Sequence, residues 1–221
     1  MNNTTEWQMS ESLGLNLLLA FSGGFQDAYT YIVRDGVFAN AQTGNIVLMS
    51  VSLMQGEWTR GLVYLFPVLA FALGVFVTDS IGFYWKNSRL LHWRQGILLM
   101  EIIIMAAVGF LPGRLNSPAA VLVSLACAMQ VQSFRKVSGN PYASTMCIGN
   151  LRSGTAALSA WFRGRGNDSL KKAGYYFAVI LVFALGAGIG GNMSIAFGER
   201  TIWGSCAVLA VCFLLMCVRG K

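Results

Sequence analysis

The fold class is decided by residues 174–197, GYYFAVILVFALGAGIGGNMSIAF, a stretch that contains no charged side chain. It is long enough to cross a bilayer as a helix, because ~20 residues span the ~30 Å hydrocarbon core. The whole chain of 221 residues is 11% charged, whereas an average soluble domain is ~25% charged. Its mean hydropathy is +0.57. This composition excludes soluble enzymes, nucleic-acid binders and disordered chains, and it predicts an integral membrane protein.

Five more apolar segments before and after this stretch approach or reach the length of a membrane span. They are residues 13–33, 61–84, 96–111, 118–134 and 201–218. Together with 174–197 they predict an all-α fold, a polytopic bundle of transmembrane helices.

Two other segments, residues 37–55 and 137–162, begin with polar residues and turn apolar after a Gly-Asn pair. Each can be a full span, or a re-entrant segment in which an extended arm enters the membrane and a short helix returns. Helices over 45–56 and 150–162 would be ~18 Å and ~20 Å long at ~1.5 Å per residue, which reaches the middle of the bilayer. These lengths favour the re-entrant interpretation.

The chain contains an internal repeat. The matching motifs are FALG at 71–74 and 183–186, and the Gly-Asn pairs at 44–45 and 149–150. We therefore predict one integral membrane domain made of two repeats, residues 1–112 and 113–221. Each repeat holds three spans and one Gly-Asn segment. Because three is an odd number, the two halves would lie upside down relative to each other, as in many channels and secondary transporters.

The loop charges discriminate between six and eight spans. The chain has a net charge of +7, and its basic residues lie mainly in short loops between the apolar segments. With six spans and both termini inside, most of these loop residues are on the inner side, as the positive-inside rule requires. With eight spans the two sides are nearly equal. The charges therefore favour six spans.

The Gly-Asn segments supply the first group of candidate site residues. Non-helical backbone cannot face lipid, so the two arms must be buried in protein or line a polar cavity. The short helices would direct free N–H groups and a partial positive charge at that cavity. Thr43, Asn45 and Asn150 suit capping or ligand binding, and Gly44 and Gly149 permit a close approach of the backbone. The alternative is that all of them are ordinary helix caps and buried hydrogen-bonding residues.

Charged residues within the predicted spans supply the second group, because a charge in a membrane usually faces the bundle interior. Asp27 is the best candidate, since it follows Gln26 in a polar part of its span. It can bind a cation, carry a proton or form a structural pair with Arg152. Structural or interfacial roles are expected for the carboxylates nearer the span ends, Asp79 and Glu101. The predicted substrate-binding set is Gln26, Asp27, Asn40, Thr43, Gly44, Asn45, Gln130, Gly149, Asn150 and Arg152.

Other motifs point away from enzymatic chemistry. Residues 186–191, GAGIGG, match a dinucleotide-binding pattern, but they lie inside an apolar run without the preceding strand that such a site needs. We expect them to pack helices closely. The cysteines, read as packing residues, are Cys127, Cys147, Cys206, Cys212 and Cys217. With His92 as the one histidine, no metal or nucleophile set is visible, so we expect neither an enzyme nor a cofactor.

Four stretches of the sequence carry a resemblance to a known family. They are FSGGFQDAY at 21–29, FANAQTGN at 38–45, AMQVQSFR at 128–135 and ASTMCIGNLR at 143–152. The chain resembles the YoaK family of bacterial membrane proteins, a domain of unknown function, over nearly its whole length. The resemblance implies a multi-pass protein of the bacterial cytoplasmic (inner) membrane, and it implies no substrate. Ile148 stands where the family pattern has threonine, which argues against a required hydroxyl there.

These observations lead to two functional expectations. The first is a transporter or channel for a small polar solute or anion, with proton coupling as an option. The second is a non-transporting membrane protein that binds a lipid or a partner subunit. Anionic lipid headgroups would then contact the basic loop residues Arg163, Arg165, Lys171 and Lys172. Either protein can form a homo-oligomer, and neither is expected to bind nucleic acid.

Overall fold

The computed structural model describes residues 11–85, 93–137, 140–142 and 144–218, and His92 therefore lies outside the described residues. The predicted all-α class is confirmed. The α-helices are α1 (Leu13–Val33), α2 (Gln42–Met54), α3 (Trp58–Trp85), α4 (Trp93–Val108), α5 (Asn116–Ser133), α6 (Cys147–Phe162), α7 (Asn167–Phe197) and α8 (Ile202–Val218). Two short 3-10 helices, η2 (Gly113–Leu115) and η3 (Gly198–Thr201), precede α5 and α8. A small antiparallel hairpin pairs β1 (Lys136–Val137) with β2 (Asn140–Pro141), an element that the sequence analysis does not predict.

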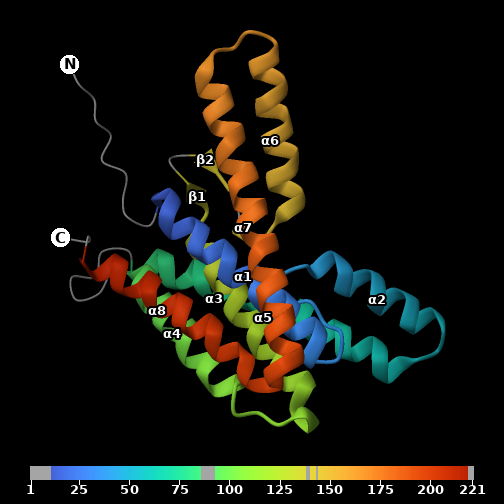
Figure 1. Cartoon of the computed structure of the whole chain (residues 1–221). Helices are drawn as coiled ribbons and strands as arrows, with labels where there is room; N and C mark the ends of the chain where they lie inside the picture. Colours follow the sequence, from blue (N-terminus) through green and yellow to red (C-terminus); the bar gives the residue numbers. More distant parts are fainter. Residues whose placement is uncertain (1–10, 86–92, 138–139, 143, 219–221) are drawn as a thin grey trace.

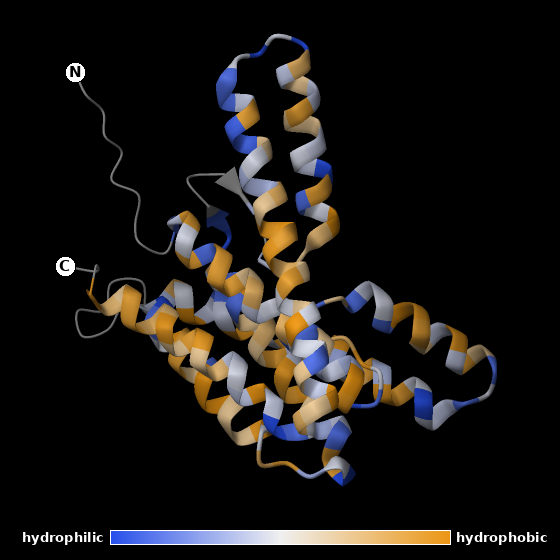
Figure 2. Cartoon of the chain, viewed as in Figure 1, coloured by the Kyte–Doolittle hydropathy of each residue, from blue (hydrophilic) through white to orange (hydrophobic). Residues whose placement is uncertain are grey.

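Within the described residues, three helical stretches are long and apolar enough to cross a membrane. They are Trp58–Tyr84, Gly113–Ser133 and Asn167–Val218. Many large apolar side chains on these stretches face outward, as Phe76, Leu181 and Leu214 do. Figure 2 shows the same feature as apolar colouring on the outer faces of the helices. Such a surface is suited to lipid rather than to water.

The remaining two predicted spans also form helices. Helix α1 has the predicted bounds, and it lies at the centre of the bundle with most of its residues buried (Figure 1). Helix α4 begins and ends three residues earlier than the predicted span at 96–111. The backbone tightens after Val108, where the N–H groups of Phe110 and Leu111 bond to the carbonyls of Ala107 and Val108, three residues back.

Contacts at the two ends of the bundle show how α1, α4, α5 and α8 run. At one end, Arg94 Nε–H donates to the Ser133 carbonyl at 2.9 Å, so α4 begins where α5 ends. Gln95 lies near Cys217 at the same end, so α8 also ends there. At the other end, Arg34 contacts the Val108 carbonyl, which joins the ends of α1 and α4. Helices α1 and α4 therefore run one way, and α5 and α8 run the other way.

Close glycine contacts give the directions of α3 and α7. A side chain added at Gly186 or Gly190 would collide with Phe21 or Phe25, so α7 runs parallel to α1. Gly74 lies against the Leu125 carbonyl in the same manner, and farther along Gln132 donates to Asp79. Helix α3 therefore runs parallel to α5. The packing role predicted for the glycines at 186–191 is confirmed at Gly186 and Gly190.

The helix pairs follow a simple pattern. Helix α1 packs on α7 and α3 packs on α5, and these are the two most extensive contacts. In addition α2 packs on α3, α6 on α7, α4 on α5, α8 on α1, and α4 on α8. Exchanging each helix for the one four places away in the numbering leaves these pairs unchanged, whereas the smaller α3–α4 contact has no counterpart of that size between α7 and α8.

Two helical hairpins, α2–α3 and α6–α7, project from the bundle in different directions (Figure 1). Helices α2 and α6 have 13 and 16 residues. Both begin three residues earlier than predicted, so each Gly-Asn pair lies in the first turn of its helix rather than before it. The segments that precede these helices, residues 37–41 and 144–146, are non-helical. We call them arm 1 and arm 2.

Candidate functional site

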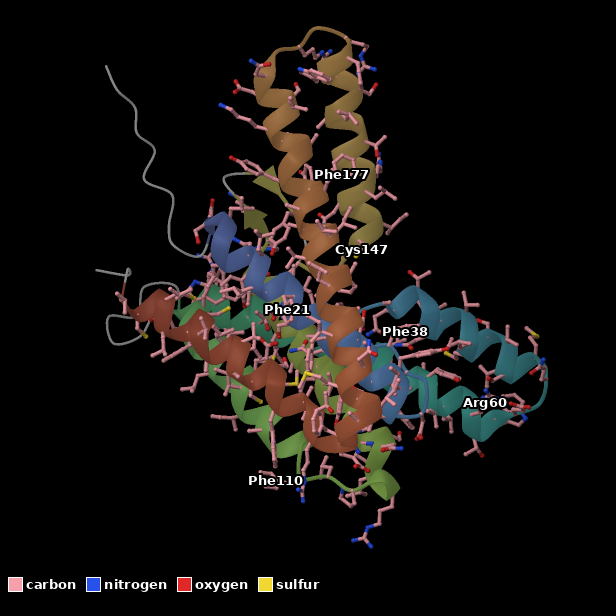
Figure 3. The ribbon with its side chains drawn as sticks, viewed as in Figure 1. Phe21, Phe38, Arg60, Phe110, Cys147 and Phe177 are labelled. Carbon is pink, nitrogen blue, oxygen red and sulfur yellow. The ribbon has the colours of Figure 1, made fainter. Side chains whose placement is uncertain are left out.

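Arm 1 and arm 2 both contact Gly23, in the middle of α1. In arm 1, the Asn40 backbone N–H donates to Asp27 Oδ1 at 2.7 Å, and Asn40 Nδ2 donates to the Gly23 carbonyl at 3.2 Å. In arm 2, the methyl group of Thr145 lies so close to Gly23 that a side chain there would collide with it. A larger residue at position 23 would therefore force the Thr145 side chain or α1 to move. Figure 3 labels Phe38, which lies in arm 1, and Cys147, which directly follows arm 2.

Gln130 attaches arm 2 to the bundle, much as Asp27 attaches arm 1. Its Nε2 group donates to Ser144 Oγ in arm 2 at 3.1 Å and to the Leu19 carbonyl of α1 at 3.3 Å. Gln130 and Ser144 are fully buried or nearly so. The two arms are thus held by polar residues of α1 and α5, which are the first spans of the two predicted repeats.

Three buried polar atoms beside the arms have no hydrogen-bond partner among the described residues. They are Asn40 Oδ1, Thr145 Oγ1 and Gln130 Oε1. Leaving such an atom unsatisfied costs about 1–3 kcal/mol, and in folded proteins it is usually partnered by water, an ion or a ligand. Three unsatisfied oxygens where two arms meet therefore form a suitable place for a solute that donates hydrogen bonds.

Asn45 shapes arm 1. Its Oδ1 accepts the Phe38 N–H at 3.0 Å, and its Nδ2 donates to the Phe38 carbonyl at 2.7 Å and to Gln42 Oε1 at 2.8 Å. Gly44 lies against the ring of Phe38. Asn150, the corresponding residue of the second half, is also buried. These contacts match a buried hydrogen-bonding role for Asn45, and the N-terminus of α2 has no side-chain cap hydrogen bond.

Apart from Gln26 and Gly44, the structure divides the predicted site residues into three groups. Asp27, Asn40 and Gln130 lie at the arms, and Asn45 and Asn150 are buried at the bases of α2 and α6. The third group is exposed or faces open space and consists of Thr43, Gly149 and Arg152. The ion pairs found within the described ranges are Glu57–Arg60 and Asp168–Lys171. Asp27 is therefore not paired with Arg152, and its Oδ1 accepts the backbone N–H of arm 1 instead.

Gln26 belongs to a second polar cluster, which we call the Gln26–Glu101 cluster. Its Nε2 group lies 3.1 Å from Ser22 Oγ, 2.8 Å from Ser205 Oγ and 3.2 Å from Glu101 Oε1. Its Oε1 atom accepts the Cys127 thiol at 2.9 Å. The cluster joins α1, α4, α5 and α8. Glu101 is fully buried, so the interfacial role expected for it is wrong. The sequence signal that could have indicated a buried role is that Glu101 is the single charged residue within the apolar segment 96–111.

Arg34 is fully buried at the opposite end of α1 from Ser12. Its guanidinium donates to the Tyr29 hydroxyl, the Asn116 side chain and two carbonyls. Its position directly after the apolar segment 13–33 predicts an ordinary loop charge. The structure shows that it instead donates hydrogen bonds to the carbonyls of Val108, at the end of α4, and of Leu111, just after it.

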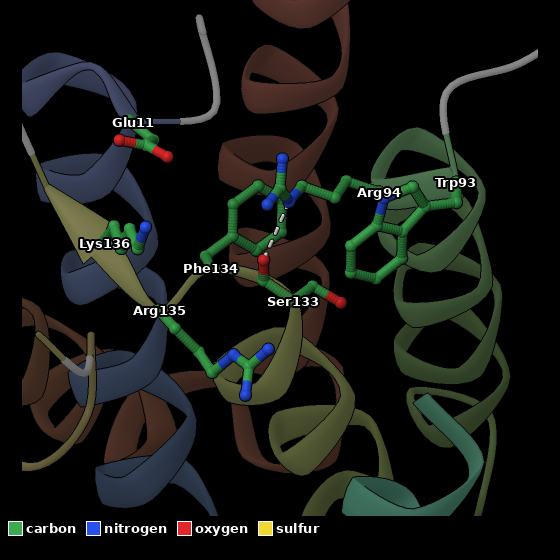
Figure 4. A pocket seen from close by; sticks show the side chains of 7 residues that line it. All are labelled: Glu11, Trp93, Arg94, Ser133, Phe134, Arg135 and Lys136. Atoms are coloured by element: carbon green, nitrogen blue, oxygen red, sulfur yellow. Dashed lines mark hydrogen bonds between the residues drawn. The ribbon is translucent and has the colours of Figure 1, made fainter. Parts of the chain in front are cut away.

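A cavity of about 180 Å³ lies where α1 and α4 begin and α5 ends. Figure 4 shows its lining, which is Glu11, Trp93, Arg94, Ser133, Phe134, Arg135 and Lys136. The basic side chains of Arg94, Arg135 and Lys136 gather positive charge around this cavity at one end of the bundle.

The fold and the two buried clusters define an all-helical protein with several helices that are suited to a membrane and with polar groups inside the bundle. The chain belongs to the family described as "Protein of unknown function (DUF1275)", whose model matches residues 15–215. No curated protein and no solved structure matches the chain.

Proposed function

We propose that the protein is a membrane transporter or channel for a small polar solute, with its solute site between arm 1 and arm 2. One observation carries the proposal: the arms come from different halves of the chain and meet at Gly23 beside three unsatisfied oxygens. Oxygen acceptors favour a solute with N–H or O–H groups. An anion is less favoured, because Arg152 is exposed on α6 and Asp27 brings a carboxyl group to the site.

The directions of the helices support six spans. Helices α1 and α3 run in opposite directions. If α2 were a full crossing between them, α1 and α3 would run in the same direction. The short helices are ~20 Å and ~24 Å long at ~1.5 Å per residue, less than the ~30 Å hydrocarbon core. Both facts agree with α2 and α6 as the short helices of two re-entrant segments.

Matching contacts support the inverted repeat. Gly74 and Gly186 end the two FALG motifs, and they lie against the carbonyls of Leu125 and Phe21. Leu125 and Phe21 each stand five residues before the corresponding glutamine of their own half, Gln130 or Gln26. The first span of each half therefore makes the same contact with the second span of the other half, which fits a duplicated and inverted chain. Membership of the YoaK family and a location in the bacterial inner membrane both stay predictions.

Cysteine labelling would test this topology. In a variant without the native cysteines, Glu57→Cys and Asp168→Cys place one thiol at each hairpin, and both positions are exposed. We expect a membrane-impermeant maleimide to label position 57 from outside and position 168 from inside. Labelling of both from the same side would support eight spans, and the cysteine-free parent is the control.

Solute flux would test the function. We expect proteoliposomes to show protein-dependent uptake of urea or glycerol, which donate hydrogen bonds, and little uptake of nitrate, measured by light scattering. Asn40→Ala and Asp27→Asn weaken the hold on arm 1 and should lower the uptake about tenfold or more, as expected for the loss of a hydrogen bond to a charged group. Thr43→Ala is the matched control, because Thr43 is exposed. Equal uptake by all variants would remove the arms from the function, and no uptake of any probe would contradict transport.

A lipid-binding function is the second candidate, and one cavity favours it. This cavity of about 470 Å³ lies between α6 and α7 and includes Arg165, Lys172 and Tyr176 in its lining. Two of the four predicted headgroup contacts are among these residues. Tight co-purification of an anionic phospholipid that is lost in an Arg165→Gln, Lys172→Gln double variant, without solute flux, would favour this function over transport.

A further inference from the structure

The carboxyl group of Glu101 is isolated inside the bundle. It is fully buried, and its Oε1 atom accepts a hydrogen bond from Gln26 Nε2 at 3.2 Å. Its Oε2 atom is also buried and has no hydrogen-bond partner in the part of the chain that the structure describes. The proposed solute site does not use this group.

No positive charge faces Glu101 from the described parts of the neighbouring helices. The titratable groups around it are Cys127 on α5 and Cys206 and Cys212 on α8. On α1 the nearby Asp27 carboxylate is occupied by arm 1. On α3, which also packs against α4, Asp79 accepts from Gln132 at the surface. A carboxylate ion without a cation is strongly disfavoured in such a place, so Glu101 is held as the neutral acid.

Loss of that proton would change the hydrogen bonds of Gln26. The two N–H hydrogens of its amide are now shared among three acceptors, Ser22 Oγ, Ser205 Oγ and Glu101 Oε1. An ionised carboxylate is the strongest of the three acceptors, so it would draw these hydrogens away from the serines. The contact between α1 and α8 through Ser22 and Ser205 would then rearrange. Gln26 is adjacent in the chain to Asp27, which holds arm 1.

We propose that Glu101 is the proton-binding residue that couples proton movement to solute movement. The O–H bond of the acid breaks and the proton passes to water on one side of the membrane. The carboxylate then takes the Gln26 N–H groups, and it is reprotonated by water from the other side. The coupling part of this inference rests on the proposed transport function, whereas proton binding by Glu101 does not.

Infrared spectroscopy of the reconstituted protein tests proton binding alone. We expect a protonated-carboxyl C=O band at neutral pH that is lost in Glu101→Gln and retained in Glu57→Gln, a matched change at an exposed glutamate. Because Gln mimics the neutral acid in shape, Glu101→Gln should fold with wild-type thermal stability. A spectrum of Glu101→Gln identical to that of the wild type in this region would overturn the inference.

Proton flux tests the coupling. Vesicles that hold a pH-sensitive dye should show proton movement when a gradient of urea or glycerol is imposed on the wild type and on Glu57→Gln. Glu101→Gln should lose that proton movement. If the wild type moves solute and Glu101→Gln moves protons equally well, coupling through Glu101 is wrong and transport still stands. If no probe moves through the wild type, the transport function fails, and the infrared result still decides whether Glu101 binds the proton.

Discussion

Replacing Arg34 by alanine is expected to destabilise the protein by at least about 3 kcal/mol, because hydrogen bonds to a buried charged group contribute ~1.5–3 kcal/mol each. The side chain is fully buried, and its Nη2 group donates to the Val108 and Leu111 carbonyls at 3.1 Å and 3.0 Å. Its Nη1 group donates to Asn116 Oδ1 at 2.9 Å. Removing the guanidinium would leave these acceptors, one buried and two partly buried, without their donors.

The same reasoning predicts that Arg34→Lys does not rescue the fold. Lysine carries a compact ammonium group and lacks the planar fork that reaches several acceptors at once. Thermal unfolding in detergent, followed by tryptophan fluorescence, measures both variants. Arg114→Ala is the matched control, since Arg114 is exposed near the same end of the bundle. Equal melting temperatures for Arg34→Ala and Arg114→Ala would show that the buried arginine does not hold α1, α4 and α5 together.

Adding one methyl group at Gly186 is expected to destabilise the bundle by about 1–3 kcal/mol, the usual cost of overpacking. The new Cβ atom would collide with the Phe21 carbonyl, a backbone group that cannot move away unless α1 shifts. Gly74→Ala should behave alike, because its Cβ atom would meet the Leu125 carbonyl.

Gly188, two residues after Gly186 on the same helix, provides the control position for Gly186→Ala. A Cβ atom there meets nothing within 4 Å, so Gly188→Ala should be neutral or stabilising by up to ~1 kcal/mol through its better helix propensity. Thermal unfolding of the three variants distinguishes a close helix contact from a general intolerance of substitution. If Gly186→Ala and Gly188→Ala have the same stability, α1 and α7 do not pack as the structure shows.

Much of the fold follows from the sequence alone. Hydropathy and the small supply of charge predict helices suited to a membrane, and α1 has the predicted bounds of 13–33. The repeated motifs direct attention to the two Gly-Asn segments, and polar residues among apolar ones identify Asp27 and Gln130. These signals are local, because the length and composition of one helix decide whether it can lie in lipid.

Only the tertiary structure decided which polar groups meet. Gln26 and Glu101 are 75 residues apart in the chain, and Asn40 and Thr145 reach Gly23 from different halves. Nothing in the hydropathy of a span predicts these partners, because lipid is as apolar as the interior and a bundle helix need not show a distinct inner face. Close packing of small residues and pairing of buried polar groups set the contacts, and both depend on the arrangement of all helices together.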